Sequence, residues 1–167
     1  LFIFLAYSTT SLTGRHLGSG RRDLALRSGV EAMWLAGGIG AVAAILLAVF
    51  ASPLLTWLGA DAATLPHALA YLRSSAPGLI GMFVVLAATG TLRGFQDTRT
   101  PLIAASVGAA FNAVANWALM YPLGLGVAGS GLGTALTQTL MALFLGGIVT
   151  RAARREGVSL KPSTYGL

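Results

Sequence analysis

The residues best suited to bind an ion or a ligand are polar side chains inside long uncharged stretches. Asn112 and Asn116 are four residues apart, and Thr134 and Gln138 repeat that spacing further along the chain. In a helix, residues four apart project from the same face. Their oxygens can line a water-filled cavity, or they can form hydrogen bonds that join two helices. Thr89, in an earlier uncharged stretch, belongs to the same group, and spacing favours the cavity only for the asparagine pair.

The residues that enzymes use for catalysis are poorly placed for it. His16 and His67 fall in connections on opposite sides of the predicted membrane, and the chain has no cysteine. The acidic residues lie in connections or at the ends of apolar stretches: Asp23, Glu31, Asp61, Asp97 and Glu156. No nucleophile, acid–base pair or metal cluster can be assembled from this set. We therefore expect no enzyme activity, no catalytic residue, no metal site and no cofactor.

One glycine motif imitates a nucleotide-binding fingerprint. Gly124, Gly126 and Gly129 have the spacing of the dinucleotide motif. That motif needs a preceding strand and an acidic residue about 20 positions later. Here the motif joins two apolar stretches, and no acid follows until Glu156. We therefore interpret it as a tight turn followed by close helix packing.

The composition is that of a membrane protein. Of the 167 residues, 55% are hydrophobic and only 10% are charged, and the mean hydropathy is +0.76. The net charge of +6 is concentrated in short clusters between uncharged runs. This is the pattern of membrane topology and not of a nucleic-acid-binding surface, so we expect a lipid bilayer and no nucleic acid as partner.

The apolar stretches predict an all-α transmembrane bundle. About 20 apolar residues are needed to cross the hydrocarbon core. The chain offers one partial span and four full spans, at 1–13, 30–59, 74–92, 101–121 and 127–150. We expect the partial span to be the end of a helix that begins before the chain. The segment 14–28 is predicted to be a polar connection.

Two further connections carry candidate helix caps. Segment 60–73 is predicted to be a loop or an interfacial helix with Asp61 as its N-cap. Segment 93–99 is predicted to be a short charged turn. It is followed by Thr100 as a capping residue and by Pro101 at the first helical position.

The basic residues assign an orientation. The connection at 14–28, the turn at 93–99 and the tail after residue 150 together contain ten Lys and Arg residues, whereas the opposite side has only Arg73. Because cytoplasmic connections are enriched in Lys and Arg, these three segments are expected to face the cytoplasm.

Three stretches together resemble the multidrug and toxic compound extrusion (MATE) family, in its DinF-like branch. They are GRHLGSG at 14–20, LRGFQDTRTP at 92–101 and GLGVAGSGLGT at 124–134. The second resembles that branch's cytoplasmic turn between the fourth and fifth helices, and its marked residues are Arg93, Gln96, Asp97, Arg99 and Pro101. The first resembles the turn after the second helix, and the third resembles the entry to the sixth.

The resemblance implies a twelve-helix exporter of two six-helix lobes, located in the cell inner membrane. Residues 1–150 would be helices two (partial) to six of the amino-terminal lobe, and 151–167 would begin the cytoplasmic linker to a missing carboxy-terminal lobe. Such a protein would export organic, often cationic, compounds by alternating access, driven by a coupling proton or sodium ion. Asn112, Asn116 and Thr134 match positions of the family's cation-responsive cluster.

One departure leaves the coupling ion open. Asn116 stands where some members carry an aspartate, and an amide cannot gain or lose a proton. The family's first helix, with its key acidic residue, has no counterpart in this sequence.

Two other functions remain as alternatives. A lipid-linked oligosaccharide flippase of the same superfamily would need basic residues inside its cavity, and the predicted spans hold none there. A non-transporting membrane scaffold would use the polar residues only for fixed bonds between helices.

Overall fold

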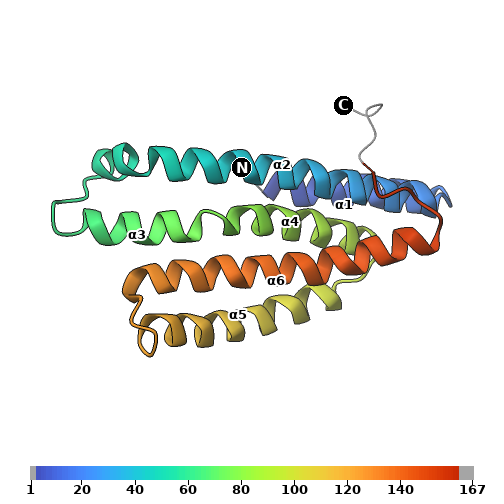
Figure 1. The fold of residues 1–167 in the computed structure, drawn as a ribbon. Helices are drawn as coiled ribbons and strands as arrows, with labels where there is room; N and C mark the ends of the chain where they lie inside the picture. The colour runs from blue at the N-terminus through green and yellow to red at the C-terminus, as the bar shows by residue number, and fades with distance from the viewer. Residues whose placement is uncertain (1–2, 162–167) are drawn as a thin grey trace.

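The computed structural model describes residues 3–161, and it is all-helical there, as predicted. Its six helices run in chain order: α1 (Ile3–Gly18), α2 (Arg22–Trp57), α3 (Leu65–Ser75), α4 (Gly78–Gly94), α5 (Arg99–Met120) and α6 (Gly126–Arg155). They lie roughly alongside one another in an elongated bundle (Figure 1). The start of the predicted partial span and the end of the predicted linker fall outside the described residues.

Three helices are long and apolar enough to cross a membrane, namely α2, α5 and α6. Helices α3 and α4 pass the same length and hydropathy test as a pair bent by 50° at a short break, and they make a fourth candidate span if they cross as one. Pro77 lies at that break and has no N–H to donate to the preceding turn. This set agrees with the four full spans expected from the sequence.

The prediction for segment 60–73 was partly wrong. Residues from Leu65 onward form helix α3, which packs on α2 and α6. Asp61 is not the N-cap, since that position belongs to Thr64. Asp61 Oδ1 instead accepts a 2.7 Å hydrogen bond from the backbone N–H of Thr64. This bond lowers the pKa of Asp61.

The prediction of a polar connection at 14–28 was also wrong, because the connection is shorter than expected. Helix α1 continues to Gly18 and α2 begins at Arg22, so the turn between them is very short. Gly20 provides the positive φ of 75° that the turn requires. A polar helix end is stable outside the lipid, and α2, with 36 residues, is about 54 Å long against a hydrocarbon core of about 30 Å.

Helix α4 is the centre of the bundle and packs on α1, α2 and α6. Its fully buried Phe83, Ala87 and Ala88 meet Val30 of α2 and Leu145 of α6 in one apolar core. Helix α5 lies at the periphery, where it packs mainly on α6. One face of α5 is therefore left open.

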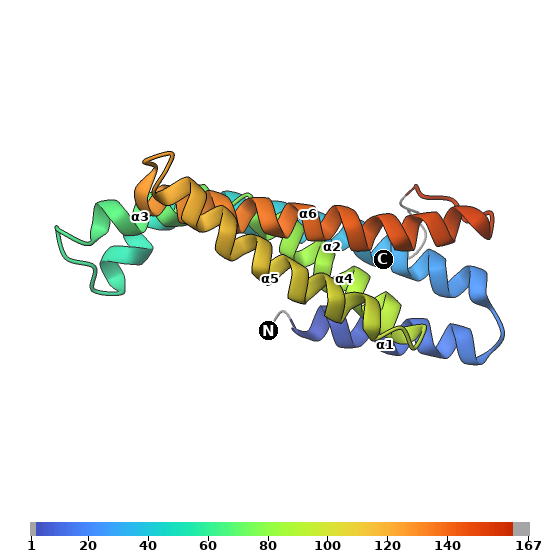
Figure 2. The ribbon, with the colours of Figure 1, turned by 90° about the horizontal axis from the view of Figure 1, so that it is seen from below.

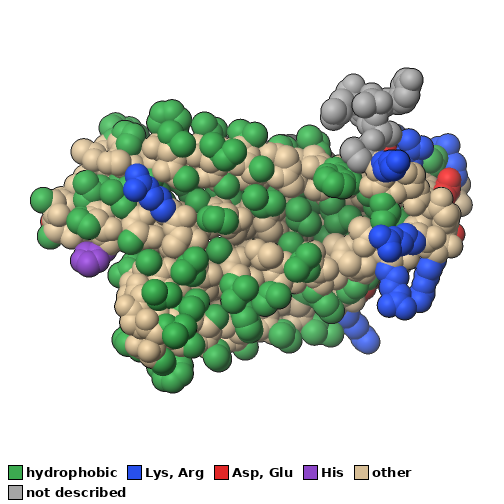
Figure 3. Space-filling view, in the orientation of Figure 1, with side chains coloured by type: hydrophobic (Ala, Val, Ile, Leu, Met, Phe, Trp, Pro, Cys, Tyr) green, Lys and Arg blue, Asp and Glu red, His purple; other side chains and the backbone are tan. Residues whose placement is uncertain are grey.

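The two ends of the bundle differ in charge. Lys and Arg side chains gather where α2 begins and α6 ends, and apolar side chains cover the flanks (Figure 3). The α4–α5 turn lies at the same end (Figure 1). The basic segments therefore lie at one end of the bundle, and their cytoplasmic location stays a prediction.

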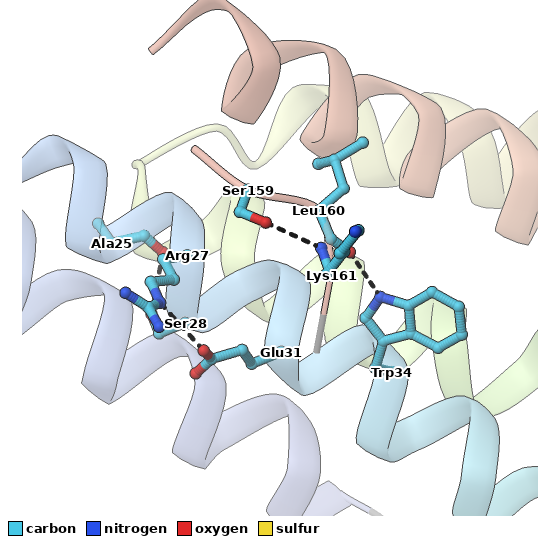
Figure 4. Close-up of polar contacts among 8 residues, drawn as sticks. All are labelled: Ala25, Arg27, Ser28, Glu31, Trp34, Ser159, Leu160 and Lys161. Carbon is cyan, nitrogen blue, oxygen red and sulfur yellow. Dashed lines mark hydrogen bonds and ion pairs between the residues drawn. The ribbon is translucent and has the colours of Figure 1, made fainter. Parts of the chain in front are cut away.

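The segment after α6 folds back onto α2. The indole Nε1–H of Trp34 donates a 2.9 Å hydrogen bond to the carbonyl of Leu160 (Figure 4). Val158 and Leu160 pack against the apolar core, and Glu156 forms a 3.1 Å ion pair with Arg22. The start of the predicted linker is therefore attached to the bundle.

Candidate functional site

Helices α5 and α6 form an antiparallel seam with a regular register. Gly133 of α6 lies opposite Asn116 of α5, and one turn further on a hydrogen bond joins Thr137 to Asn112. The contacts therefore move four residues along each helix at every step, which is the spacing of one helix face. The register places both asparagines against α6.

The two asparagines and Thr137 form a hydrogen-bonded chain across this seam. Asn116 Nδ2 donates to Asn112 Oδ1 at 3.2 Å, and Asn112 Nδ2 donates to Thr137 Oγ1 at 3.2 Å. The hydroxyl of Thr137 donates in turn to the carbonyl of Gly133 at 2.8 Å. A polar chain of this kind satisfies groups that lipid cannot.

One oxygen of the chain lacks a partner. Asn116 Oδ1 is buried and accepts no hydrogen bond from the described residues. It points at Gly133, where any Cβ would collide with it. A buried acceptor without a donor is unfavourable, so this oxygen is available to a cation, a water or a polar group of a ligand.

The other predicted cavity residues lie near this chain without joining it. Thr134 Oγ1 donates to the carbonyl of Ser130 on its own helix at 3.1 Å. Gln138 and Thr89 are half-buried, on α6 and α4. The structure thus brings Asn112 and Asn116 together, and their bonded partner on α6 is Thr137.

Sequence reasoning missed Thr137, although a signal for it was present. Gly133, Thr137 and Met141 recur at steps of four, which marks a second face of α6 beside that of Thr134 and Gln138. Gly133 is the residue that allows close approach. Ser130 and Thr134 follow the same spacing, so this signal marks two faces of α6 and does not decide between them.

The turn between α4 and α5 is a glycine-type helix end built without glycine at the key position. Gln96 has a φ of 63°, which is rare for a residue with a side chain. Its N–H donates to the carbonyl of Arg93 at 2.9 Å, and that of Asp97 donates to the carbonyl of Leu92 at 2.9 Å. These two bonds define a Schellman motif.

Helix α5 begins at Arg99 with Thr98 in the N-cap position, so the prediction of Thr100 as the cap was wrong. Asp97 Oδ1 accepts a 3.0 Å hydrogen bond from the backbone N–H of Thr100. Hydrogen bonds from the side chain and backbone of Thr100 lower the pKa of Asp97 below its ordinary value. Pro101 is buried at the third helical position and not at the first, and Arg99 is exposed at the helix start.

Arg22, at the start of α2, contacts both this turn and the end of α6. Its guanidinium lies 5.5 Å from the ring centre of Phe95 in the turn, and its Nε lies 3.1 Å from Glu156 at the end of α6. Within residues 3–161, no group of three or more His, Cys, Asp or Glu side chains could hold a metal ion. The polar chain of the α5–α6 seam is therefore our candidate site.

Comparison with known proteins identifies relatives of one kind. Residues 1–118 match the MatE family model. Protein DETOXIFICATION 44, chloroplastic, of Arabidopsis thaliana is 36% identical over 113 residues, which are 66% of this chain and 22% of that protein. DNA damage-inducible protein F of Escherichia coli is 31% identical over 162 residues, which are 95% of this chain and 35% of that protein. The chain thus spans only about a fifth to a third of these relatives.

Solved structures agree in fold. The inward-facing conformation of a multidrug resistance MATE family transporter of the MOP superfamily matches with a TM-score of 0.81 at 25% identity, and the match covers 87% of this chain and 33% of that one. MATE in the straight conformation matches with a TM-score of 0.82 at 25% identity, over 98% of this chain and 37% of that one.

Proposed function

This chain belongs to the MatE family, and on that premise we propose that it forms part of an exporter of organic, often cationic, compounds. The family resemblance expected from the sequence motifs, including its DinF-like branch, is confirmed by the matching relatives. In the proposal, a proton or sodium gradient drives export by alternating access in the cell inner membrane. The remaining helices, including a carboxy-terminal lobe, belong to the whole transporter.

The observation that carries the proposal is the unpartnered Asn116 Oδ1 inside a spanning segment. Most buried polar atoms have a hydrogen-bond partner, and the exceptions need an explanation. Polar groups inside membrane spans commonly mark the path of an ion or substrate. We assign Asn112, Asn116 and Thr137 as the centre of the coupling site. Thr134, Gln138 and Thr89 extend it toward the rest of the cavity.

Asn112 and Asn116 act by binding and not by proton transfer, because an amide does not titrate near neutral pH. Their carbonyl oxygens and the Thr137 hydroxyl suit a hard cation such as sodium, which prefers oxygen ligands. If a proton is the coupling ion, a carboxylate outside this chain has to carry it. Both ions therefore remain in the proposal.

Two competing functions differ from this one in a testable way. A flippase for a pyrophosphate-linked lipid would need cations in the cavity, but the basic residues of α2, α4, α5 and α6 lie at their cytoplasmic ends. A scaffold would use the Asn112–Thr137 bond only as a link between helices. It would show no gradient-dependent transport.

The test is ethidium uptake into everted vesicles that contain the full-length protein, under an imposed proton or sodium gradient. We expect Asn112→Ala and Asn116→Ala to lower gradient-dependent uptake by about fivefold or more, the scale of a coupling free energy of about 1 kcal/mol. Thr134→Ala is tested in parallel and should have a smaller effect, because its hydroxyl bonds within its own helix.

Ser106→Ala is the matched control, because Ser106 is an exposed polar residue of the same helix. Normal uptake in both asparagine variants at normal expression would show that these residues serve only to pack the helices. An absence of gradient-dependent uptake of any organic cation by the wild type would favour the flippase or the scaffold.

A further inference from the structure

The outward side of the α5–α6 seam holds a groove that the polar chain does not use. It is a cavity of about 420 Å³ with almost wholly apolar walls. Ile103, Val107 and Phe111 line it from α5, and Leu140 and Phe144 line it from α6. Several of these side chains are open to the surroundings, with Val107 63% exposed and Phe144 54% exposed. The groove therefore faces outward from this bundle.

The groove exists because α5 and α6 separate toward the cytoplasmic end (Figure 2). At the outer end, the Gly129 backbone meets the backbone of Leu119 directly. Further in, Gly108 of α5 meets only the flexible side chain of Met141. The hydroxyl of Thr137 is bonded inside the seam, so the groove gains no free polar group from it.

An exposed arginine extends each wall of the groove at its cytoplasmic end. Arg99 precedes Ile103 by one helical turn on α5, and Arg151 follows Phe144 by two turns on the same face of α6. Arg99 is the first residue of α5, and Arg151 lies close to the end of α6. Basic side chains gather at that end of the bundle (Figure 3). In the part of the chain that the structure describes, neither forms an ion pair, because the pairs there use Arg22 and Arg27.

This combination has the chemistry of a phospholipid. An apolar groove about 12 Å long accommodates part of an acyl chain, by the rise of the α5 residues 103–111. Two cations beyond its cytoplasmic end suit a phosphate, and arginine binds phosphate in a bidentate manner. A negative headgroup is favoured over a zwitterionic one, because no carboxylate pairs with these arginines within residues 3–161. Apolar packing alone would not discriminate between the two.

We propose that the α5–α6 groove binds one anionic phospholipid of the cytoplasmic leaflet, with an acyl chain along Ile103, Val107 and Phe144 and the phosphate between Arg99 and Arg151. The groove borders the polar chain at Thr137, whereas Asn112 and Asn116 lie roughly 100° around α5 from Phe111 and its stripe. The inference does not depend on transport.

A reporter tryptophan in the groove tests the proposal. The full-length protein carries Phe144→Trp, with every native tryptophan replaced by phenylalanine, and is reconstituted in vesicles with dibrominated phosphatidylglycerol or dibrominated phosphatidylcholine. Bromine quenches a tryptophan that it contacts, so the two titrations give relative affinities at this position. We expect phosphatidylglycerol to be preferred about fivefold for each arginine, and the preference to fall by that factor in Arg99→Gln and in Arg151→Gln.

Leu35→Trp in the same background is the matched reporter. Leu35 is an exposed apolar residue of α2, two turns from Arg27, whose charge is balanced by Glu31 in a 3.1 Å ion pair. We expect no headgroup preference there. Arg15→Gln, which removes a cytoplasmic arginine from another helix, should leave the preference at Phe144→Trp unchanged.

Three results would overturn the proposal. Equal quenching by both lipids would show ordinary contact with bulk lipid. Quenching by neither lipid would show that another part of the protein covers the groove. If the preference for phosphatidylglycerol survived both arginine substitutions, it would arise from the overall positive charge of the protein. Native mass spectrometry of the wild-type protein provides a second readout, in which retained phosphatidylglycerol should decrease in Arg99→Gln and Arg151→Gln.

Discussion

Helix α6 packs against two neighbours in two physically different ways. Toward α4 its closest contacts are with backbone: a Cβ at Gly78 would lie 2.7 Å from the Cα of Ala135, and one at Gly81 would lie 2.6 Å from the carbonyl oxygen of Gln138. Toward α5, beyond the Gly129 contact at the outer end, the nearest atoms belong to side chains. There, glycines meet Asn116 and Met141.

The difference separates a fixed part of the bundle from an adjustable one. Two backbones in contact have no rotamers to change, so the α4–α6 seam tolerates no added atom. Side chains can rearrange, and polar ones can exchange a partner in the protein for a bound ion or water. We infer that α4 and α6 hold the frame, whereas the inner part of α5 is the element that a bound ligand could shift. If α5 is the adjustable element, three substitutions should lower the free energy of unfolding by decreasing amounts.

The largest effect is expected for Gly81→Ala. Its methyl group would press on the Gln138 carbonyl, and neither backbone can yield without separating α4 from α6. Overpacking of this kind costs about 3 kcal/mol. We expect a loss of that size in the free energy of unfolding, measured by denaturant titration of the full-length protein in detergent micelles.

The control for Gly81→Ala is Gly38→Ala. Gly38 is exposed on α2, with nothing within 4 Å of an added Cβ. It should unfold like the wild type or slightly later, because alanine favours helix by about 1 kcal/mol. Equal effects at the two positions would show that the α4–α6 seam is not rigid.

A smaller effect is expected for Thr137→Val in the polar part of the α5–α6 seam. Valine keeps the shape but removes the hydroxyl that accepts from Asn112, and an interhelical bond in a membrane contributes about 1 kcal/mol. We expect a loss near that value in the same unfolding titration. Ethidium uptake should fall more than stability does, because Asn112 loses its orientation in the proposed site.

Thr139→Val controls for the loss of a hydroxyl in this helix. Thr139 is exposed, and its hydroxyl donates to the carbonyl of Ala135 on its own helix at 2.8 Å. It should change neither stability nor uptake. If Thr137→Val behaved in the same way, the hydrogen-bonded chain would have no part in holding or positioning α5.

The contrast between the two seams also explains what could be predicted from the sequence. The spans, their order and the asparagine pair followed from hydropathy and spacing. The thickness of the lipid core sets the length of a span, and residues four apart lie on the same face of a helix. The partner of Asn112 did not follow. Helix α6 is apolar or small on every side, so its sequence does not distinguish the face of Thr137 from that of Thr134.

The packing of helix α3 could not be predicted for a related reason. Segment 60–73 is less apolar than a span, so composition favoured a loop or an interfacial helix. Its packing against α6 depends on Gly131, where a Cβ would lie 2.6 Å from the carbonyl oxygen of Tyr71. This packing depends on a glycine of another helix, so the hydropathy of segment 60–73 alone cannot predict it.

The smallest effect is expected for Gly108→Ala, in the α5–α6 seam beside the groove. Its Cβ would lie 2.5 Å from Sδ of Met141, which is at first sight as close as the contact at Gly81. The obstacle here is a flexible thioether next to a cavity of about 420 Å³, so Met141 can turn into free space. We expect a change in the free energy of unfolding of about 1 kcal/mol or less. A loss as large as that of Gly81→Ala would mean that α5 is held as rigidly as α4, and the distinction between frame and adjustable element would fail.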